Sequence, residues 1–135
     1  MKSLQIYINE YIVKKKLDKF VDSEDHYKYA PKTKGELIGN IEELIDNKIY
    51  DFNCIDTSKI TDMSDLFYMV KDSVDMQFDV SDWDVSNVKY MNYMFFNCKN
   101  LNCDLNNWNV SNATNMYNTF KKCLSLKNTP SWYKE

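Results

Sequence analysis

The chain has 135 residues, of which 44% are hydrophobic and 15% aromatic. This apolar content suffices for one packed domain and exceeds that of a disordered chain. Only two glycines and two prolines are present, which argues against a β-sandwich or barrel with many hairpins and excludes glycine-rich phosphate loops. The net charge is −3 and all 17 basic residues are lysine. Without arginine, bidentate readout of phosphate or guanine is not expected, so nucleic acid is not a predicted partner.

The first 17 residues predict an N-terminal amphipathic helix, over about residues 3–16. Leu4, Ile8, Tyr11 and Ile12 share one of its faces, which could pack on the domain, dock on a partner or lie on a membrane surface. The lysine cluster follows the apolar stretch instead of preceding it, so we expect no secretion signal. Since no segment has transmembrane length either, we expect synthesis in the cytoplasm, with the cysteines as thiols.

Two further segments precede the main part of the chain. Residues 18–32 are polar and predict a linker, in which His26, the only histidine, is interpreted as an exposed loop residue and not as a catalytic group. Residues 33–48 predict a helix that caps the domain, because Thr33 and Glu36 have capping-box spacing. Its apolar face consists of Leu37, Ile41, Leu44 and Ile45.

An internal repeat occupies residues 49–135. The segments DTSKITDMSDLF, DVSNVKYMNYMF and NVSNATNMYNTF align, and their serines are 28 and then 25 residues apart. Five columns recur in this alignment: Ser58, Ser86 and Ser111; Met63, Met91 and Met116; Phe67, Phe95 and Phe120; Trp83, Trp108 and Trp132; Cys98 and Cys123. A single unit cannot bury its apolar face alone, so we expect the columns to stack into one continuous core.

Each repeat unit predicts one short strand and one short helix. A serine before apolar residues at helical spacing is typical of a helix N-cap. Alternation in Tyr50–Phe52, Phe78–Val80 and Cys103–Leu105 favours short strands, with a degenerate fourth near Leu126. The predicted fold class is therefore an α/β repeat: a short leucine-rich-repeat-type solenoid with a parallel sheet and a helical N-terminal cap.

The repeat also resembles a known family. FDVSDWDVSNVKYMNYMFFNCKNL and LNNWNVSNATNMYNTFKKCLSL resemble the repeat of BspA-like leucine-rich-repeat proteins, over about residues 50–132. Many such proteins are surface proteins implicated in adhesion and protein binding, so the resemblance implies a binding role and carries over no catalytic residue. The preface KYAPKTKGELI and the opening MKSL also resemble a subgroup encoded by crAss-like gut bacteriophages, which implies a phage setting and a virion role.

The cysteine and acidic columns each admit more than one interpretation. Cys98 and Cys123 are interpreted as buried thiols, although a disulfide is geometrically possible, and the Cys98–Cys103 spacing has no matching ligand pair for a structural zinc site. The acidic columns, which are Asp56, Asp84 and Asn109, and Asp79 and Asp104, could bind Ca²⁺ or act as acids and bases. We interpret them as hydrogen-bond acceptors for local backbone groups. No cofactor or metal is predicted.

The exposed positions of the repeat are rich in tyrosine and asparagine. Tyr90, Tyr93 and Tyr117, with Leu4, Ile8, Tyr11 and Ile12, are the predicted partner contacts. The sequence thus predicts a non-enzymatic module for protein–protein interaction or structural docking, in a virion or on a host protein. Two alternatives are a bacterial surface adhesin and a phage-encoded inhibitor of a host protein. The oligomeric state is left open.

Overall fold

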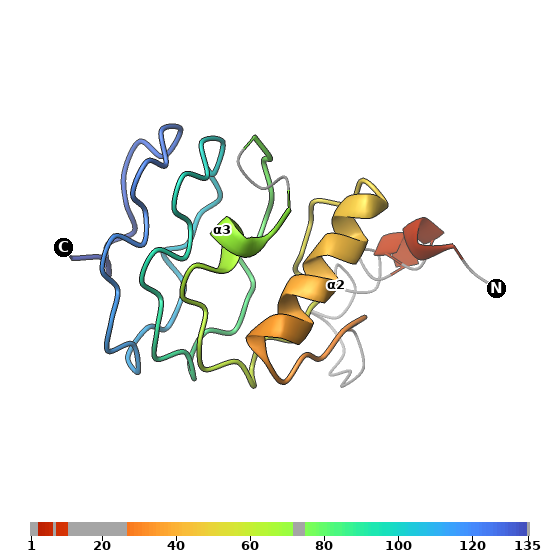
Figure 1. Cartoon of the computed structure of the whole chain (residues 1–135), viewed down its shortest axis with the longest axis horizontal. Coiled ribbons are helices and arrows are strands. Elements are labelled where there is room, and N and C mark those ends of the chain that lie inside the picture. Colours follow the sequence, from red (N-terminus) through yellow and green to blue (C-terminus); the bar gives the residue numbers. More distant parts are fainter. Residues whose placement is uncertain (1–2, 7, 11–26, 72–74, 135) are drawn as a thin grey trace.

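The computed structural model describes residues 3–6, 8–10, 27–71 and 75–134. Its two named helices are α2, Lys34–Asp46, and α3, Leu66–Met69, and residues 4–6 and 8–10 are also helical. After α2 the chain passes through successive loops that lie side by side, and α2 crosses the end of this stack nearest the N-terminus (Figure 1). The rest of the predicted N-terminal helix, with Tyr11 and Ile12, lies outside the described residues, as do His26 and most of the predicted linker.

The predicted capping helix is confirmed as α2. Thr33 is its N-cap, and the Thr33 hydroxyl accepts a hydrogen bond from the Glu36 backbone N–H at 3.1 Å. The Glu36 carboxylate accepts a further bond from the N–H of Lys32 at 2.8 Å. Leu37, Ile41 and Leu44 are fully buried. These three residues lie on one face because they are three or four positions apart, so α2 closes one end of the hydrophobic core.

The predicted leucine-rich-repeat solenoid with a parallel sheet is wrong. In the ranges that the structure describes, the loops pair only through isolated parallel bridges, such as Asp51 with Asp79 and Tyr90 with Asn115, and no strand forms. Of the predicted helices, one in each repeat, only the four-residue α3 forms. Ser86 is not a helix N-cap: its hydroxyl donates to the Asp84 carboxylate at 2.6 Å. Ser58 and Ser111 likewise lie in turns and precede no helix directly.

Consecutive turns take the place of the expected helices. In the second repeat the N–H groups of Met94, Phe96 and Cys98 bond to the carbonyl three residues earlier. The N–H groups that alternate with them bond to the next repeat instead: Met91, Tyr93, Phe95 and Asn97 donate to the carbonyls of Asn115, Tyr117, Thr119 and Lys121. A helix would use all these donors internally. Apolar residues about three apart face inward in either conformation, which explains why the sequence pattern indicated helices.

The expected strands also fail for a local reason. The aspartate in the middle of each of the first three segments, such as Asp79, accepts a hydrogen bond from the N–H two residues later, here Ser81 at 2.8 Å. Such an Asx turn bends the chain. Each segment therefore leaves its neighbour after a single bridged residue, too soon for a strand to form.

The repeat columns nevertheless stack into one core. The rings of Phe67, Phe95 and Phe120 lie in a row, with centroid separations of 5.4 and 5.5 Å and interplanar angles of 10°. Each tryptophan indole N–H donates to a carbonyl of the preceding loop: Trp83 to Phe52 at 2.9 Å, Trp108 to Val80 at 3.2 Å and Trp132 to Leu105 at 2.7 Å. The tryptophans thus join neighbouring loops by both packing and hydrogen bonding.

Candidate protein-interaction surface

The acidic columns serve the backbone, as predicted. Asp56, Asp84 and Asn109 each accept a hydrogen bond from the N–H of the serine two residues later, at 3.0, 3.0 and 3.1 Å. Asp79 and Asp104 do the same for Ser81 and Asn106. For Asp104 the bonds from the Asn106 backbone and side chain lower the carboxyl pKa below its usual value. These oxygens therefore have a structural role.

The four cysteines are free thiols. Cys98 is fully buried and Cys123 nearly so, and the Cys123 thiol donates to the Phe95 carbonyl at 3.0 Å. Burial raises the pKa of Cys98 far above its usual range, and the neighbouring Cys123 raises it further. Burial also raises the pKa of Cys123 to about 11. Thiols with raised pKa values are poor nucleophiles and poor metal ligands at neutral pH.

Two further observations concern ligands and membranes. Among the described residues, no group of three or more His, Cys, Asp or Glu side chains is placed to hold a metal ion. In the same part of the chain, no helix is both long and apolar enough to span a bilayer.

A lysine of α2 bonds to the loop at the N-terminal end of the stack. At the α2 end, the ammonium group of Lys34 donates to the Ser64 carbonyl at 3.1 Å and to the Ser64 hydroxyl at 3.2 Å, and lies 3.4 Å from the Asp62 carboxylate. In the next two repeats the carbonyls equivalent to that of Ser64 accept backbone N–H groups from the preceding loop. Lys34 therefore supplies the donor that a further loop would have provided.

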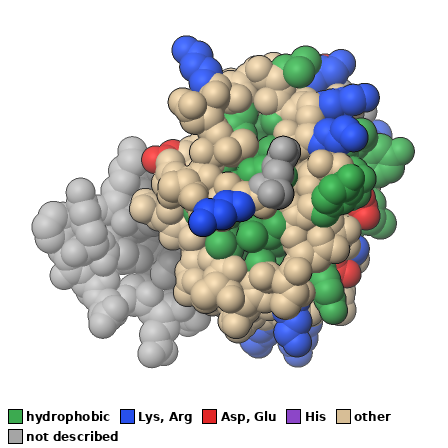
Figure 2. Space-filling model, turned by 90° about the vertical axis from the view of Figure 1, so that its left-hand side faces the viewer, with side chains coloured by type: hydrophobic (Ala, Val, Ile, Leu, Met, Phe, Trp, Pro, Cys, Tyr) green, Lys and Arg blue, Asp and Glu red, His purple; other side chains and the backbone are tan. Residues whose placement is uncertain are grey.

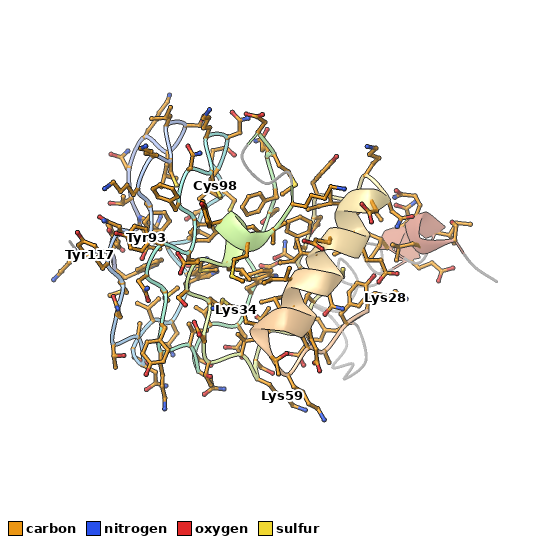
Figure 3. The ribbon with its side chains drawn as sticks, in the orientation of Figure 1. Lys28, Lys34, Lys59, Tyr93, Cys98 and Tyr117 are labelled. Atoms are coloured by element: carbon orange, nitrogen blue, oxygen red, sulfur yellow. The ribbon has the colours of Figure 1, made fainter. Side chains whose placement is uncertain are left out.

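A row of aromatic rings, exposed at both ends and half-buried in the middle, crosses the three repeats. We call this row the aromatic strip; it consists of Tyr68, Phe96, Tyr93 and Tyr117. Successive rings meet edge to face, with centroids 5.9, 5.8 and 5.7 Å apart. Tyr68 is 68% exposed and Tyr117 65% exposed. Tyr93 and Tyr117 lie next to each other toward the C-terminal end (Figure 3).

Polar neighbours fix the middle of the strip. The Asn118 side-chain amide donates to the Tyr93 hydroxyl at 3.3 Å, and the Lys122 ammonium lies 5.7 Å from the centroid of the Phe96 ring. Both contacts come from the adjacent repeat, so they hold the rings in place before any partner arrives. Preorganised aromatic side chains contribute much contact area at small entropic cost.

The other predicted contact residues have different positions. Tyr90 is 46% exposed and forms the bridge between Asp62 and Asn115. Ile8 is only 1% exposed and belongs to the core, and Leu4 packs partly buried against the same core. Of the apolar residues in the described part of the N-terminal helix, Leu4 and Ile8 therefore face the domain, whereas Ile6 is 50% exposed.

Sequence reasoning named Tyr93 and Tyr117 but missed Tyr68 and Phe96. A signal was present, since these two residues each follow a phenylalanine of the core column and are 28 positions apart. No repeat pattern indicated the Lys34 contacts, because Lys34 lies in α2, outside the repeats, and its partners are 28 and 30 positions away in the sequence.

Comparison with known proteins gives one match. Searches of curated proteins and of solved structures found no similar chain. Residues 37–134 match the family described as "Mycoplasma protein of unknown function, DUF285", a repeat family associated with BspA-like surface proteins. The matched range begins inside α2 and includes every repeat and the whole aromatic strip, and it covers well over half of the chain. The chain therefore belongs to the DUF285 family.

Proposed function

We propose that this protein is a non-enzymatic module that binds another protein through its aromatic strip. The observation that carries the proposal is the continuous edge-to-face row from Tyr68 to Tyr117, which spans three repeats and is strongly exposed at both ends. Tyrosine is enriched at protein interfaces, where its ring buries apolar area and its hydroxyl stays hydrogen-bonded.

The polar groups of the repeats support a binding role over catalysis. The aspartates of the repeat columns accept backbone hydrogen bonds, and burial raises the pKa values of the cysteines. A catalytic site needs a nucleophile or base with a tuned pKa in an accessible position. The groups that recur along the stack are instead committed to turns and to the core.

The test compares two double variants of the full chain. The strip variant carries Tyr68→Ser and Tyr117→Ser, and the control carries Tyr50→Ser and Leu124→Ser, which remove a tyrosine and a second exposed apolar side chain outside the strip. Each protein is immobilised, and proteins retained from a lysate of the encoding organism are quantified by mass spectrometry. We expect the strip variant to lose at least about tenfold of a specific partner that the wild type and the control retain. Equal retention by all three proteins would contradict the proposal.

A narrower setting for this role is a component of a phage virion. It is supported by the resemblance of the preface and opening residues to proteins of crAss-like phages. Mass spectrometry of purified virions tests it, and the protein should be present at a fixed ratio to the capsid protein. Detection on the surface of intact bacterial cells, with none in virions, would instead favour an adhesin.

A further inference from the structure

We propose that the C-terminal end of the stack binds an extended, acidic segment of a partner protein, which adds to the last repeat through its backbone. This inference deepens the proposed function by naming a class of partner, and it concerns a different surface from most of the aromatic strip. It rests on the hydrogen-bonding pattern between repeats, on a groove at the open end and on the local charge.

The pattern between repeats defines what an added segment would meet. Tyr90 bridges two groups of the preceding loop: its N–H donates to the Thr61 carbonyl, and its carbonyl accepts the Met63 N–H at 2.8 Å. Asn115 repeats this arrangement one loop later, with the carbonyl of Lys89 and the N–H of Met91. Each loop therefore presents one carbonyl and a series of N–H groups to the next loop.

The last repeat presents the same groups without a following loop. The equivalent carbonyl is that of Thr114, and the equivalent donors belong to Met116, Asn118, Phe120 and Lys122. None of these five backbone groups has a hydrogen-bond partner within the part of the chain that the structure describes. At the α2 end the corresponding edge is covered by the helix and by Lys34. The Thr114 carbonyl and the Met116 N–H thus offer an extended segment one bridging position for backbone pairing, whereas the Asn118, Phe120 and Lys122 donors belong to turns.

A groove lies at this edge. It has a volume of about 420 Å³, and its lining residues are Ala113, Thr114, Met116, Tyr117, Asn118 and Lys134. One residue of an added segment would donate its N–H to the Thr114 carbonyl and accept the Met116 N–H with its own carbonyl, as Asn115 does with Lys89 and Met91. The groove therefore lies where the side chain and backbone of that residue would enter, with the partly buried Ala113 and Met116 as its apolar wall.

The charge at this end favours an acidic segment. Residues 103–135 contain four lysines, which are Lys121, Lys122, Lys127 and Lys134, and two acidic residues, Asp104 and Glu135, whereas the whole chain has a net charge of −3. On the face that looks out from this end, several lysine side chains lie around a hydrophobic centre, with a few acidic side chains at the rim (Figure 2). Opposite charge on the partner accelerates encounter and selects among segments that could pair equally well through the backbone.

The experiment is a titration of the ¹⁵N-labelled full chain with a synthetic peptide of alternating aspartate and valine, beside a peptide of alternating lysine and valine. We expect the aspartate peptide to slow hydrogen exchange of the Met116 amide at least about fivefold, and the lysine peptide to leave it unchanged. Perturbation confined to other amides, or equal effects of both peptides, would overturn the proposal.

Four variants separate the contributions of the charge, the groove and the aromatic strip. Lys121→Glu, Lys122→Glu and Lys134→Glu together should weaken binding of the aspartate peptide about tenfold, whereas Lys59→Glu in the first repeat (Figure 3) should change it less than twofold. Ala113→Phe should block the groove and abolish binding. Tyr68→Ser should leave peptide binding unchanged, so failure at the edge is distinguishable from failure of the aromatic strip.

Hydrogen exchange of the protein alone tests whether a second copy of the chain binds at this edge. If the Met116 amide becomes protected as the concentration of the protein alone rises, a second copy occupies the edge and the proposed partner is wrong. We expect the amide exchange rates of the free protein to be independent of its concentration.

Discussion

The ammonium group of Lys34 and the backbone carbonyl of Ser64 form a hydrogen bond of 3.1 Å that joins helix α2 to the first repeat. This carbonyl occupies the position at which later repeats accept a backbone N–H, so one lysine side chain replaces a backbone donor. A buried or partly buried carbonyl without a donor is destabilising. Lys34 therefore allows the stack of loops to begin at a helix.

Replacement of Lys34 tests this relationship. Lys34→Met keeps the aliphatic stem but removes the ammonium group, so we expect the free energy of unfolding to fall by about 1–2 kcal/mol. Lys59→Met removes an exposed lysine of the first repeat and should change the free energy of unfolding by less than about 0.5 kcal/mol. Urea denaturation followed by tryptophan fluorescence measures both. Equal effects would show that the Lys34 contacts add nothing to stability.

Asp62 should make the protein sensitive to acid. Burial by itself would raise the pKa of Asp62, but hydrogen bonds from Ser64 and the ammonium of Lys34 outweigh it and lower the pKa below 3.8. Because the folded-state pKa is depressed, this stabilisation is present above the unfolded value and is lost as the pH falls through the folded value. The Asp62 side chain is 44% exposed, so solvent screening limits the effect.

The Asp62→Asn variant measures that contribution. Urea midpoints of wild type and variant should differ at pH 7, with the variant less stable, and should converge as the pH is lowered below 3.8. Asp104→Asn is a useful comparison, because Asp104 also has a lowered pKa but lacks a lysine partner. A wild-type advantage that persists undiminished at low pH would contradict the assignment.

The indole hydrogen bonds should contribute beyond ring packing. Trp83 is 3% exposed and donates to the Phe52 carbonyl, so Trp83→Phe should lower the free energy of unfolding by about 1 kcal/mol through loss of this buried hydrogen bond, while the Ile55 N–H still bonds to the same carbonyl. Trp132→Phe should have a smaller effect, since Trp132 is only partly buried. Denaturation monitored by circular dichroism avoids the changed fluorescence. A larger loss for Trp132→Phe would contradict this ranking.

Lys48 offers a stabilising substitution. It follows the C-cap of α2 with a φ of 60°, a left-handed conformation that costs a non-glycine residue about 1 kcal/mol. The turn itself is well bonded, since the Ile49 N–H donates to the Leu44 carbonyl at 2.9 Å. Lys48→Gly should therefore raise the melting temperature, whereas Lys59→Gly, where φ is not positive, should lower it. Thermal unfolding of the two variants measures both changes in melting temperature.

The cysteines should resist modification in the folded protein. Burial raises the pKa of Cys54 to about 12, and Cys98 is fully buried. Reaction with a chromogenic disulfide reagent at pH 8 should be slow for both and should become rapid in denaturing urea. Mass spectrometry of partly reacted protein identifies the modified sites. Rapid labelling of native Cys98 would show that the Phe and Cys columns open far more easily than their packing implies.

The sequence by itself determined the periodic part of this protein. The repeat boundaries, the stacked phenylalanines, the Asx acceptors and the capping helix were all predictable, because each depends on residue type at a fixed local spacing. Local spacing also produced the main error. Apolar residues every three or four positions, as in Val88, Met91 and Phe95, satisfy a helix and a series of turns equally well.

Only the tertiary structure decided between those two conformations. Alternate N–H groups find carbonyls on the neighbouring loop, and this pairing between loops favours turns over helices. The same long-range contacts created the Lys34 bridge and the exposed groups of Thr114 and Met116 at the opposite end. Such features depend on which loops become neighbours in space, and hydrogen bonds between residues some 25 positions apart leave no mark in the local pattern of residues.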